Sequence, residues 1–206
     1  AGRIARSVEN RLLAYFSRQL ETKVDAVILS DYAKGVCSPA LCRNVVQTCR
    51  QYQVPLVVDP KGAQWQKYKG AYLVTPNVKE LGEASRAKVG NDDKTIVAVG
   101  TALRQRFSFE SLMVTRSEQG LTLLASAEPV HIPTYAREVF DVSGAGDTVA
   151  AVMGAALAAG LKPTTAAHLA NLAAGVVVGK LGTYAISAAE LDAALADVER
   201  LEDWEK

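Results

Sequence analysis

Cysteine, histidine and long hydrophobic runs are scarce in this sequence, and each scarcity excludes a class of protein. The chain has three cysteines and two histidines in 206 residues. Cys37, Cys42 and Cys49 lie on or near one expected helix without a second cluster, so neither a zinc site nor a disulfide framework fits, and reduced cytosolic thiols are expected. The most apolar run, residues 145–161, is rich in Ala and Gly and contains Asp147, so it is too short and too weakly hydrophobic to span a membrane.

The sequence also lacks an imbalance of charge. It has 23 Lys and Arg residues against 22 Asp and Glu residues, a formal net charge of +1, and no basic or acidic tail. Such a chain has no general field for nucleic acid or for an anionic membrane, so neither is expected as a partner. Residues 1–20 carry arginines along their whole length and lack an apolar centre, which excludes a signal peptide and favours a cytoplasmic location.

What is present is an alternation of helical and strand patterns. With 49% apolar and 22% charged residues, the chain is long enough for one domain over residues 1–206 with a substantial core. The expected strands are residues 26–29, 55–58, 71–75, 112–115, 121–125 and 129–133, and the expected helices are residues 7–20, 38–52, 92–107, 145–159, 164–179 and 187–198. This order predicts a layered α/β domain.

Polar loops follow the first three expected strands. Asp31 follows the first strand, Asp59 and Lys61 follow the second, and a polar loop with Asn77 and Glu80 follows the third. Open α/β sheets bind ligands at the C-terminal ends of parallel strands, so the recurrence of these loops predicts a site at one edge of the sheet. Any one of the loops, taken alone, is better explained as a solvated turn.

The segment DVSGAGDT, at residues 141–148, passes directly into an expected helix. Small residues with free backbone N–H groups at a helix start form a site for phosphate or another anion. Asp147 then has two interpretations. Its carboxylate either supports the helix through the dipole, or lies beside an anion site and takes the proton from an attacking hydroxyl.

Other motifs do not support a site. The segment GVVVGK, at residues 175–180, has one residue too few between its glycines for a P-loop, and Leu181 stands where Ser or Thr would reach a metal. His131 and His168 lie in an expected strand and an expected helix without a third metal ligand at suitable spacing, so both are expected to be structural. The glycine turn is not a Gly-x-Ser-x-Gly nucleophile elbow, which excludes serine hydrolase chemistry.

Several separated segments, in this order, resemble a known family. DVSGAGDT resembles the C-terminal signature of the PfkB, or ribokinase-like, carbohydrate kinases, and TPNVKE at residues 75–80 resembles their Asn-x-x-Glu motif. Four further segments resemble the D-glycero-D-manno-heptose 7-phosphate kinase branch, namely SDYAKG at 30–35, DPKG at 59–62, VTRSEQG at 114–120 and GVVVGKLGT at 175–183. The resemblance covers residues 26–191 and implies a ribokinase-like three-layer αβα domain with a mostly parallel central sheet.

The resemblance implies roles for the matching positions. Asp147 matches the catalytic base, and Asn77 and Glu80 match the motif that holds Mg²⁺ largely through water. The anion hole for the transferred phosphoryl group is expected at the N–H groups of Gly144, Ala145 and Gly146. The ATP-binding positions are expected to be Asn77, Val78, Lys79, Glu80, Thr115, Ser117, Gly120, Asn171, Gly175 and Gly182. Such a set suits phosphoryl transfer, which needs alignment and charge stabilisation more than covalent chemistry.

The branch implies an ATP-dependent kinase that converts heptose 7-phosphate to heptose 1,7-bisphosphate for ADP-heptose and lipopolysaccharide inner-core synthesis. Mg²⁺ is the expected cofactor, ATP the co-substrate, and a monovalent cation a further candidate. Asp31, Lys34 and Lys61 are the expected substrate residues, because lysines in strand-end loops can offset the charge of a sugar phosphate. Solvated lysines, or a contact of Lys61 with ATP phosphates, are the alternatives. The alternative functions are another PfkB-family sugar or small-alcohol kinase, and a nucleotide-binding remnant without activity.

The chain departs from the family pattern at both ends. Members of the family begin with strands that carry a Gly-Gly sugar-binding motif and a β-lid, and residues 1–23 resemble neither. A fused adenylyltransferase domain is common in the branch, and the sequence contains no His-x-Gly-His signature. We therefore expect the N-terminal strands and lid to be absent, the chain to be a fragment or a monofunctional version, and the full-length form to be a homodimer.

Overall fold

A computed structural model describes residues 2–136 and 138–199 of the chain. Within them lies one six-stranded sheet in the order β1-β2-β3-β4-β5-β6. The strands are β1 Val27–Ser30, β2 Leu56–Asp59, β3 Leu73–Val74, β4 Ser111–Thr115, β5 Leu121–Leu124 and β6 Val130–Ile132. Neighbours from β1 to β4 are parallel, whereas β5 and β6 pair antiparallel at the far edge. The mostly parallel sheet predicted from the sequence is therefore confirmed.

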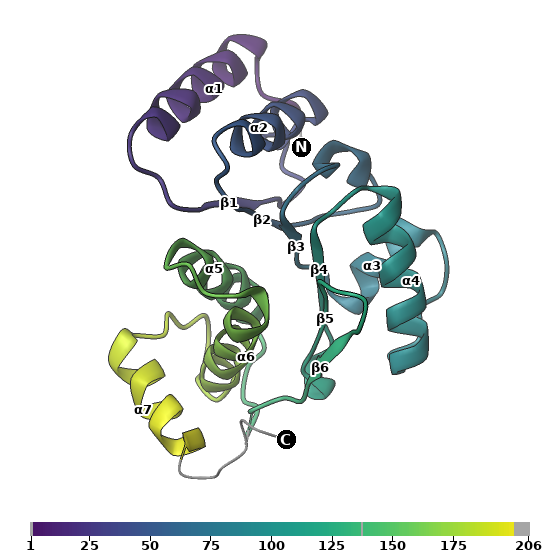
Figure 1. The fold of residues 1–206 in the computed structure, drawn as a ribbon, viewed down its shortest axis with the longest axis vertical. Coiled ribbons are helices and arrows are strands. Elements are labelled where there is room, and N and C mark those ends of the chain that lie inside the picture. Colours follow the sequence, from purple (N-terminus) through teal and green to yellow (C-terminus); the bar gives the residue numbers. More distant parts are fainter. Residues whose placement is uncertain (1, 137, 200–206) are drawn as a thin grey trace.

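Helices cover both faces of this sheet (Figure 1). One face carries α1 Arg6–Glu21, α2 Pro39–Gln51, α3 Val78–Ser85 and α4 Asp93–Arg106. The other face carries α5 Ala145–Ala158 and α6 Pro163–Val178, and α7 Ala188–Glu199 packs outside α6. Two short 3-10 turns complete the described elements, η1 Trp65–Tyr68 and η2 Ser117–Gln119. This arrangement is the three-layer α/β/α architecture that the sequence predicts.

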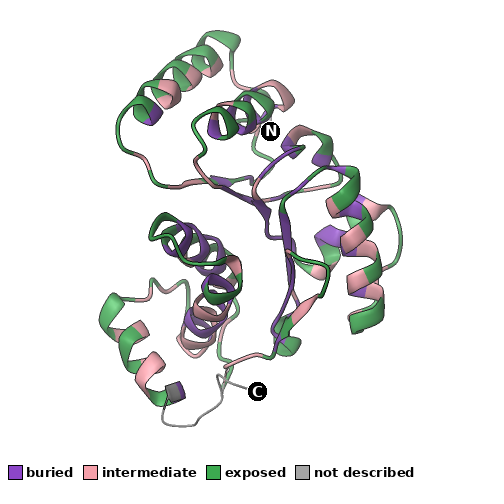
Figure 2. Ribbon diagram, viewed as in Figure 1, coloured by how far each residue is buried: buried purple, intermediate pink, exposed green. Residues whose placement is uncertain are grey.

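Strands β2 to β5 are buried on both faces, which explains why their sequences are mainly apolar rather than alternating. In β2, Leu56 and Val58 pack into the core that includes α2 and α4, whereas Val57 packs into the core with α5 and α6. Figure 2 shows these central strands mostly buried and the outer sides of the helices exposed. The sheet is therefore a rigid base for the loops that leave its strands.

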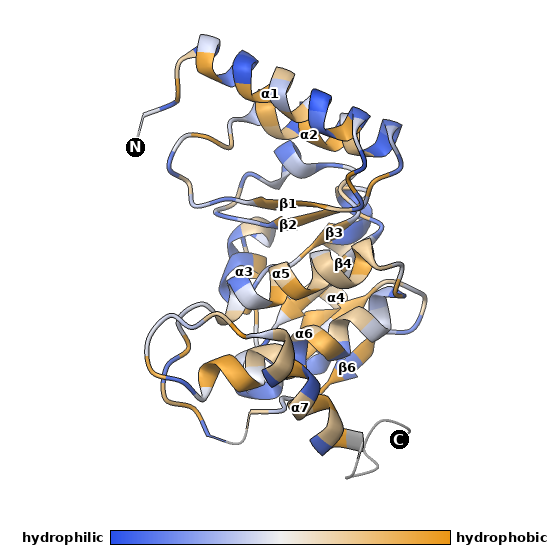
Figure 3. Cartoon of the chain, turned by 90° about the vertical axis from the view of Figure 1, so that its left-hand side faces the viewer, coloured by the Kyte–Doolittle hydropathy of each residue, from blue (hydrophilic) through white to orange (hydrophobic). Residues whose placement is uncertain are grey.

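Helix α5 lies close against the sheet because its residues are small. A Cβ on Gly154 would come within 2.7 Å of Ile28 Cδ1 in β1, so a larger residue there would push the helix off the strand. In Figure 3, α5 and α6 are mainly hydrophobic in colour, in contrast to the mixed surface of α1. Close packing fixes where the start of α5 lies relative to the ends of β1 and β2.

Most expected elements are confirmed within a residue or two, and one prediction is wrong. The polar loop predicted around Asn77 is instead the start of helix α3, with Asn77 as its N-cap. Asn77 Oδ1 accepts the backbone N–H of Glu80 at 2.9 Å, and Glu80 Oε2 accepts the backbone N–H of Asn77 at 3.1 Å. This reciprocal capping box satisfies two N–H groups at the helix start. Strand β3 is also shorter than predicted, with only Leu73 and Val74 in the ladder.

The helices are short, or carry many charged residues, compared with a membrane-spanning helix. None of those in residues 2–136 and 138–199 is long and apolar enough to cross a membrane. The apolar run of residues 145–161 consists mainly of α5, which packs in the core of the domain.

Candidate active site

Hydrogen bonds join the loops at the C-terminal ends of β1, β2 and β3. The backbone N–H of Asp31 donates to the Asp59 carbonyl at 3.0 Å, and Ser30 Oγ donates to the Asp59 carboxylate at 3.3 Å. The loop after β2 meets the helix after β3, where Lys61 Nζ donates to Glu80 Oε1 at 2.7 Å. The polar strand-end groups therefore lie along one edge of the sheet.

The glycine turn leads into α5 at this edge. Gly144 is the N-cap with φ of 83°, a left-handed conformation that glycine adopts without strain. Backbone N–H groups donate to Asp141 and hold the pKa of its carboxyl below the ordinary range, and Thr148 Oγ1 donates to the Gly144 carbonyl at 2.9 Å. Among the described residues, the N–H groups of Gly144 and Gly146 have no acceptor, and a Cβ on Gly146 would meet no atom within 4 Å. The turn thus presents open N–H donors at a helix N-terminus, as an anion site requires.

The third residue of the predicted anion hole is partly engaged. The N–H of Ala145 donates to the Val142 carbonyl at 3.3 Å, a long hydrogen bond that an incoming anion could replace. Asp147, two residues further on, is exposed, and its Oδ1 accepts the hydroxyl of Tyr32 at 2.7 Å. Tyr32 belongs to the loop after β1, so this contact joins the glycine turn to the strand-end edge.

Three carboxylates give this edge its negative charge. Burial raises the pKa of Asp59 to about 6, and the charges of Glu80 and Asp147 act in the same direction. Glu80 is 5% exposed, and both of its oxygens are occupied by the Asn77 N–H and by Lys61. In the described part of the chain, no three His, Cys, Asp or Glu side chains form a group that could hold a metal ion. Mg²⁺ keeps several water ligands and uses one or two carboxylates, so this edge fits Mg²⁺ bound largely through water.

A cavity of about 410 Å³ lies between the loop after β4 and helices α5 and α6. Seven of the residues predicted to contact ATP or its transferred phosphoryl group line it, namely Thr115, Ser117, Gly120, Ala145, Gly146, Asn171 and Gly175. Apolar walls come from Leu121, Val139 and Val142, and the buried Asn171 is fixed by donating to the Pro133 carbonyl at 2.6 Å. A mainly apolar cavity with a few polar groups and a helix N-terminus at one end suits a nucleotide.

The remaining predicted ATP residues lie outside this cavity. Val78 packs against the core, and Lys79 is exposed on α3. Gly182 is exposed, has φ of 73°, and its backbone contributes to the hydrogen bonding of Asp141. Gly182 therefore lies beside Asp141 in the glycine turn. Asn77 and Glu80 lie outside the cavity, at the sheet edge that carries Asp59, Glu80 and Asp147, which we call the acidic edge.

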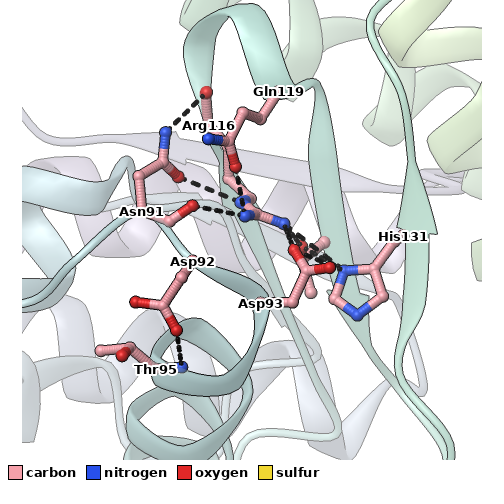
Figure 4. Close-up of polar contacts among 8 residues, drawn as sticks. Asn91, Asp92, Asp93, Thr95, Arg116, Gln119 and His131 are labelled. Atoms are coloured by element: carbon pink, nitrogen blue, oxygen red, sulfur yellow. Dashed lines mark hydrogen bonds and ion pairs between the residues drawn. The ribbon is translucent and has the colours of Figure 1, made fainter.

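Arg116 holds the loop that carries Thr115, Ser117 and Gly120 (Figure 4). It is only 2% exposed, and its guanidinium donates to Asn91, Asp93, Gln119 and Thr122. The backbone N–H of Arg116 donates to the Gly120 carbonyl at 2.8 Å, which closes the loop. A planar donor with several partners fixes a loop geometry that no single contact could hold.

The three predicted substrate residues have different surroundings. Asp31 is 3% exposed and accepts from Lys67, from Tyr68 Oη at 2.6 Å and from the Ala33 N–H at 2.7 Å. Burial works to raise the pKa of Asp31, but these hydrogen bonds outweigh it and hold the pKa below the ordinary value. Asp31 thus anchors its own loop.

The two predicted substrate lysines lie further out. Lys34 is exposed on the loop after β1, and Lys61 is paired with Glu80 at the acidic edge. The hydrogen bond to Glu80 raises the pKa of Lys61, so this ammonium stays charged. Lys61 therefore lies next to the predicted metal motif, whereas Lys34 faces solvent.

The sequence predicts no function for Tyr32. For Asp59 it predicts only a position at the end of a strand. A tyrosine after a strand carries no general signal, because its partner Asp147 is 115 positions away. For Asp59 the signal was available, since an aspartate that ends a buried strand lies at the binding edge of an α/β sheet.

Comparison with known sequences identifies the family. A model described as pfkB family carbohydrate kinase matches residues 5–190. The Bifunctional protein HldE of Geobacter sulfurreducens is 46% identical over 184 residues, which are 89% of this chain and 37% of that protein. The protein of the same name from Vibrio atlanticus is 50% identical over 173 residues, 84% of this chain and 36% of that protein. The chain thus spans less than two fifths of the length of these relatives.

Solved structures show the same fold. Phosphofructokinase-2 from Escherichia coli in complex with potassium superposes with a TM-score of 0.78 at 16% identity, over 91% of this chain and 62% of that one. A ribokinase from Thermotoga maritima gives a TM-score of 0.68 at 21% identity, over 87% of this chain and 59% of that one. The ribokinase-like fold predicted from the sequence is confirmed. Because the family model also matches most of its length, the chain belongs to the pfkB family of carbohydrate kinases, phosphotransferases that act on an alcohol group.

Proposed function

We propose that this chain provides the nucleotide-binding and base-bearing part of an ATP-dependent kinase that phosphorylates heptose 7-phosphate to heptose 1,7-bisphosphate. The observation that carries the proposal is the identity of 44–50% to proteins named HldE, which extends over 84–92% of the chain. The segments that resemble the heptose 7-phosphate kinase branch fall in this region. The product would serve ADP-heptose and lipopolysaccharide inner-core synthesis, and the protein would act in the cytoplasm.

The arrangement of the residues supports phosphoryl transfer between two adjoining regions. The nucleotide base and ribose fit the 410 Å³ cavity, and the phosphates then reach the open N–H groups of Gly144 and Gly146 at the start of α5. These donors, aimed at the transferred group, stabilise the charge that develops on its oxygens. Asp147, in the first turn of the same helix, takes the proton from the attacking sugar hydroxyl.

The acidic edge supports the metal requirement of such a reaction. Glu80, with Asn77 beside it, and Asp59 at the end of β2 would hold Mg²⁺ through water ligands. Mg²⁺ neutralises phosphate charge when it is bound with ATP. Burial, and then the charges of Glu80 and Asp147, raise the pKa of Asp59, and a cation at this edge would offset that cost.

Recognition of the substrate phosphate is assigned to Lys34. It is a cation in the loop after β1 that makes no ion pair with any described residue, whereas Lys61 is held by Glu80. Lys61 is better placed to contact the phosphates of ATP beside the metal. Both lysines remain accessible to a ligand, because each is exposed.

The test is product analysis by mass spectrometry with the full natural length of the protein, ATP and Mg²⁺. Heptose 7-phosphate should gain one phosphoryl group faster than free heptose, fructose 6-phosphate or ribose. Lys34→Ala should lower kcat/KM for the phosphorylated sugar and leave that for the free sugar unchanged, with Lys23→Ala, an exposed lysine between α1 and β1, as the matched control. A preference for fructose 6-phosphate or ribose would assign another kinase of the family, and ATP binding without turnover of any sugar would leave only a nucleotide-binding role.

A further inference from the structure

A side chain that reaches Asp147 comes from a distant part of the sequence. Tyr32 Oη donates to Asp147 Oδ1 at 2.7 Å, across a sequence separation of 115 residues. Within residues 2–136 and 138–199 this is the hydrogen bond that holds the Asp147 carboxylate. Oδ1 is therefore occupied, whereas Oδ2 accepts no hydrogen bond from the described residues.

The backbone around Tyr32 is fixed by its neighbour. Asp31 is anchored from three sides, and its backbone N–H extends the pairing of β1 to the Asp59 carbonyl. Ala33, with φ of 53°, then turns the chain away. With Asp31 directed into the protein, the next side chain emerges toward the start of α5. The buried anchoring of Asp31 thus aims Tyr32 at Asp147.

Packing does not hold the Tyr32 ring in place. The residue is 59% exposed, so its hydroxyl contact with Asp147 is what fixes the side chain. The neighbouring carboxylate raises the pKa of the Tyr32 hydroxyl, first through the hydrogen bond and then through its charge, so the phenol stays protonated. Tyr32 is consequently a stable donor and not itself a base.

We propose that Tyr32 is a positioning residue for the catalytic base, which holds one oxygen of Asp147 so that the other is directed at the acceptor hydroxyl. The proposal rests on the proposed function, in which Asp147 removes the proton of the sugar hydroxyl. A free carboxylate rotates about its terminal torsion, and a general base must stay within hydrogen-bond reach of the proton it takes. A donor fixed on a neighbouring loop removes that rotation before the substrate arrives.

Charged groups from neighbouring elements lie around this pair. Asp59, at the end of β2, lies close enough for its charge to act on Tyr32, and it interacts with the charge of Asp147. Beyond Asp59 stand Glu80 on α3 and Lys61 in the loop after β2. All of these remain when only the Tyr32 hydroxyl is removed. A change in rate on that substitution therefore reports the lost hydrogen bond.

The test compares Tyr32→Phe with Tyr15→Phe, since Tyr15 is 58% exposed on α1 and serves as the matched control. In the full natural length of the protein, Tyr32→Phe should lower kcat by about ten- to a hundred-fold, as expected for a hydrogen bond to a charged group. KM for ATP should change by less than about two-fold, because the hydroxyl contacts the base and not the nucleotide cavity.

A second readout is independent of turnover. With ¹³C in the aspartate carboxyl groups, the NMR resonance of the Asp147 carboxyl at neutral pH should shift in Tyr32→Phe and stay in place in Tyr15→Phe, because only the first substitution removes its hydrogen-bond donor. If the wild-type protein phosphorylates no sugar, the proposed function fails, and an unmoved resonance would then overturn the coupling of Tyr32 to Asp147 as well. In an active enzyme, the positioning role is overturned by an unchanged kcat, or by a lower kcat with an unmoved resonance.

Discussion

Asp59→Asn should stabilise the free protein while damaging its chemistry. Asp59 ends β2 half buried, where burial and the charges of Glu80 and Asp147 raise its pKa from 3.8 to about 6. The Ser30 hydroxyl and Lys61 act in the opposite direction but do not compensate. Asparagine has the same shape and no charge, so the substitution removes the cost of holding this carboxylate ionised.

The sign and size follow from linkage between protonation and folding. Because the folded pKa of Asp59 lies above its unfolded value, the folded state keeps a proton between pH 3.8 and about 6 that the unfolded state has released. The contribution of this group to stability therefore falls as pH rises through that window. A shift of about two pKa units corresponds to about 3 kcal/mol, and partial exposure lowers this, so we expect a gain of about 1–3 kcal/mol at neutral pH.

Urea unfolding without divalent cations measures this gain. Asp59→Asn should raise the unfolding free energy over wild type at about pH 7.5, and the two proteins should converge at about pH 4, where Asp59 is largely protonated. Asp25→Asn, an exposed aspartate before β1, is the control for loss of a carboxylate at the surface. A gain that is the same at both pH values, or a loss at pH 7.5, would refute the account of a strained carboxylate at the metal edge.

Three further substitutions test other parts of the site. Asp147→Asn should lower kcat by about 10²–10⁴-fold and leave the ATP dissociation constant from calorimetry nearly unchanged, and retained activity would exclude it as the base. Glu80→Gln should raise the Mg²⁺ concentration for half-maximal activity, and an unchanged Mg²⁺ titration would contradict the metal assignment. Arg116→Ala should destabilise the fold by about 1–3 kcal/mol and weaken ATP binding, because it leaves the buried Thr122 hydroxyl without this donor and frees the loop after β4; Arg43→Ala, on the exposed side of α2, is its control in thermal unfolding.

Local signals were sufficient to predict most of the fold. Ser38 and Pro39 predict the start of α2, and the structure has Ser38 as an N-cap that accepts the Leu41 N–H at 3.0 Å. The apolar run of β2 predicts a strand buried on both sides, and Val57 and Val58 are fully buried. These elements are specified within a few residues, so sequence pattern alone identifies them.

Contacts between distant segments were not predictable in this way. Nothing in the sequence indicates that Asp31 meets Lys67 and Tyr68, because those residues come from η1 after the next strand. The expectation that Asp31 contacts substrate therefore rested on its position after a strand, whereas its surroundings show an anchored, buried carboxylate. The position of the binding edge of the sheet was predictable. Which of its residues anchor the loops and which are free to contact a ligand depends on tertiary packing.

The missed helix α3 shows how a structural signal and a functional one coincide in the same residues. Asn77 and Glu80 were interpreted as a metal motif in a loop, yet the spacing Asn-x-x-Glu is also that of a capping box, and both side chains have that geometry. The helix start fixes the Glu80 carboxylate, and Lys61 occupies its second oxygen. Glutamine at position 80 can still accept the Asn77 N–H, whereas it loses the charge that would attract a cation. Glu80→Gln therefore separates the two roles, since α3 should stay folded in circular dichroism while the Mg²⁺ requirement rises, and a loss of helix with unchanged Mg²⁺ dependence would assign the motif to capping alone.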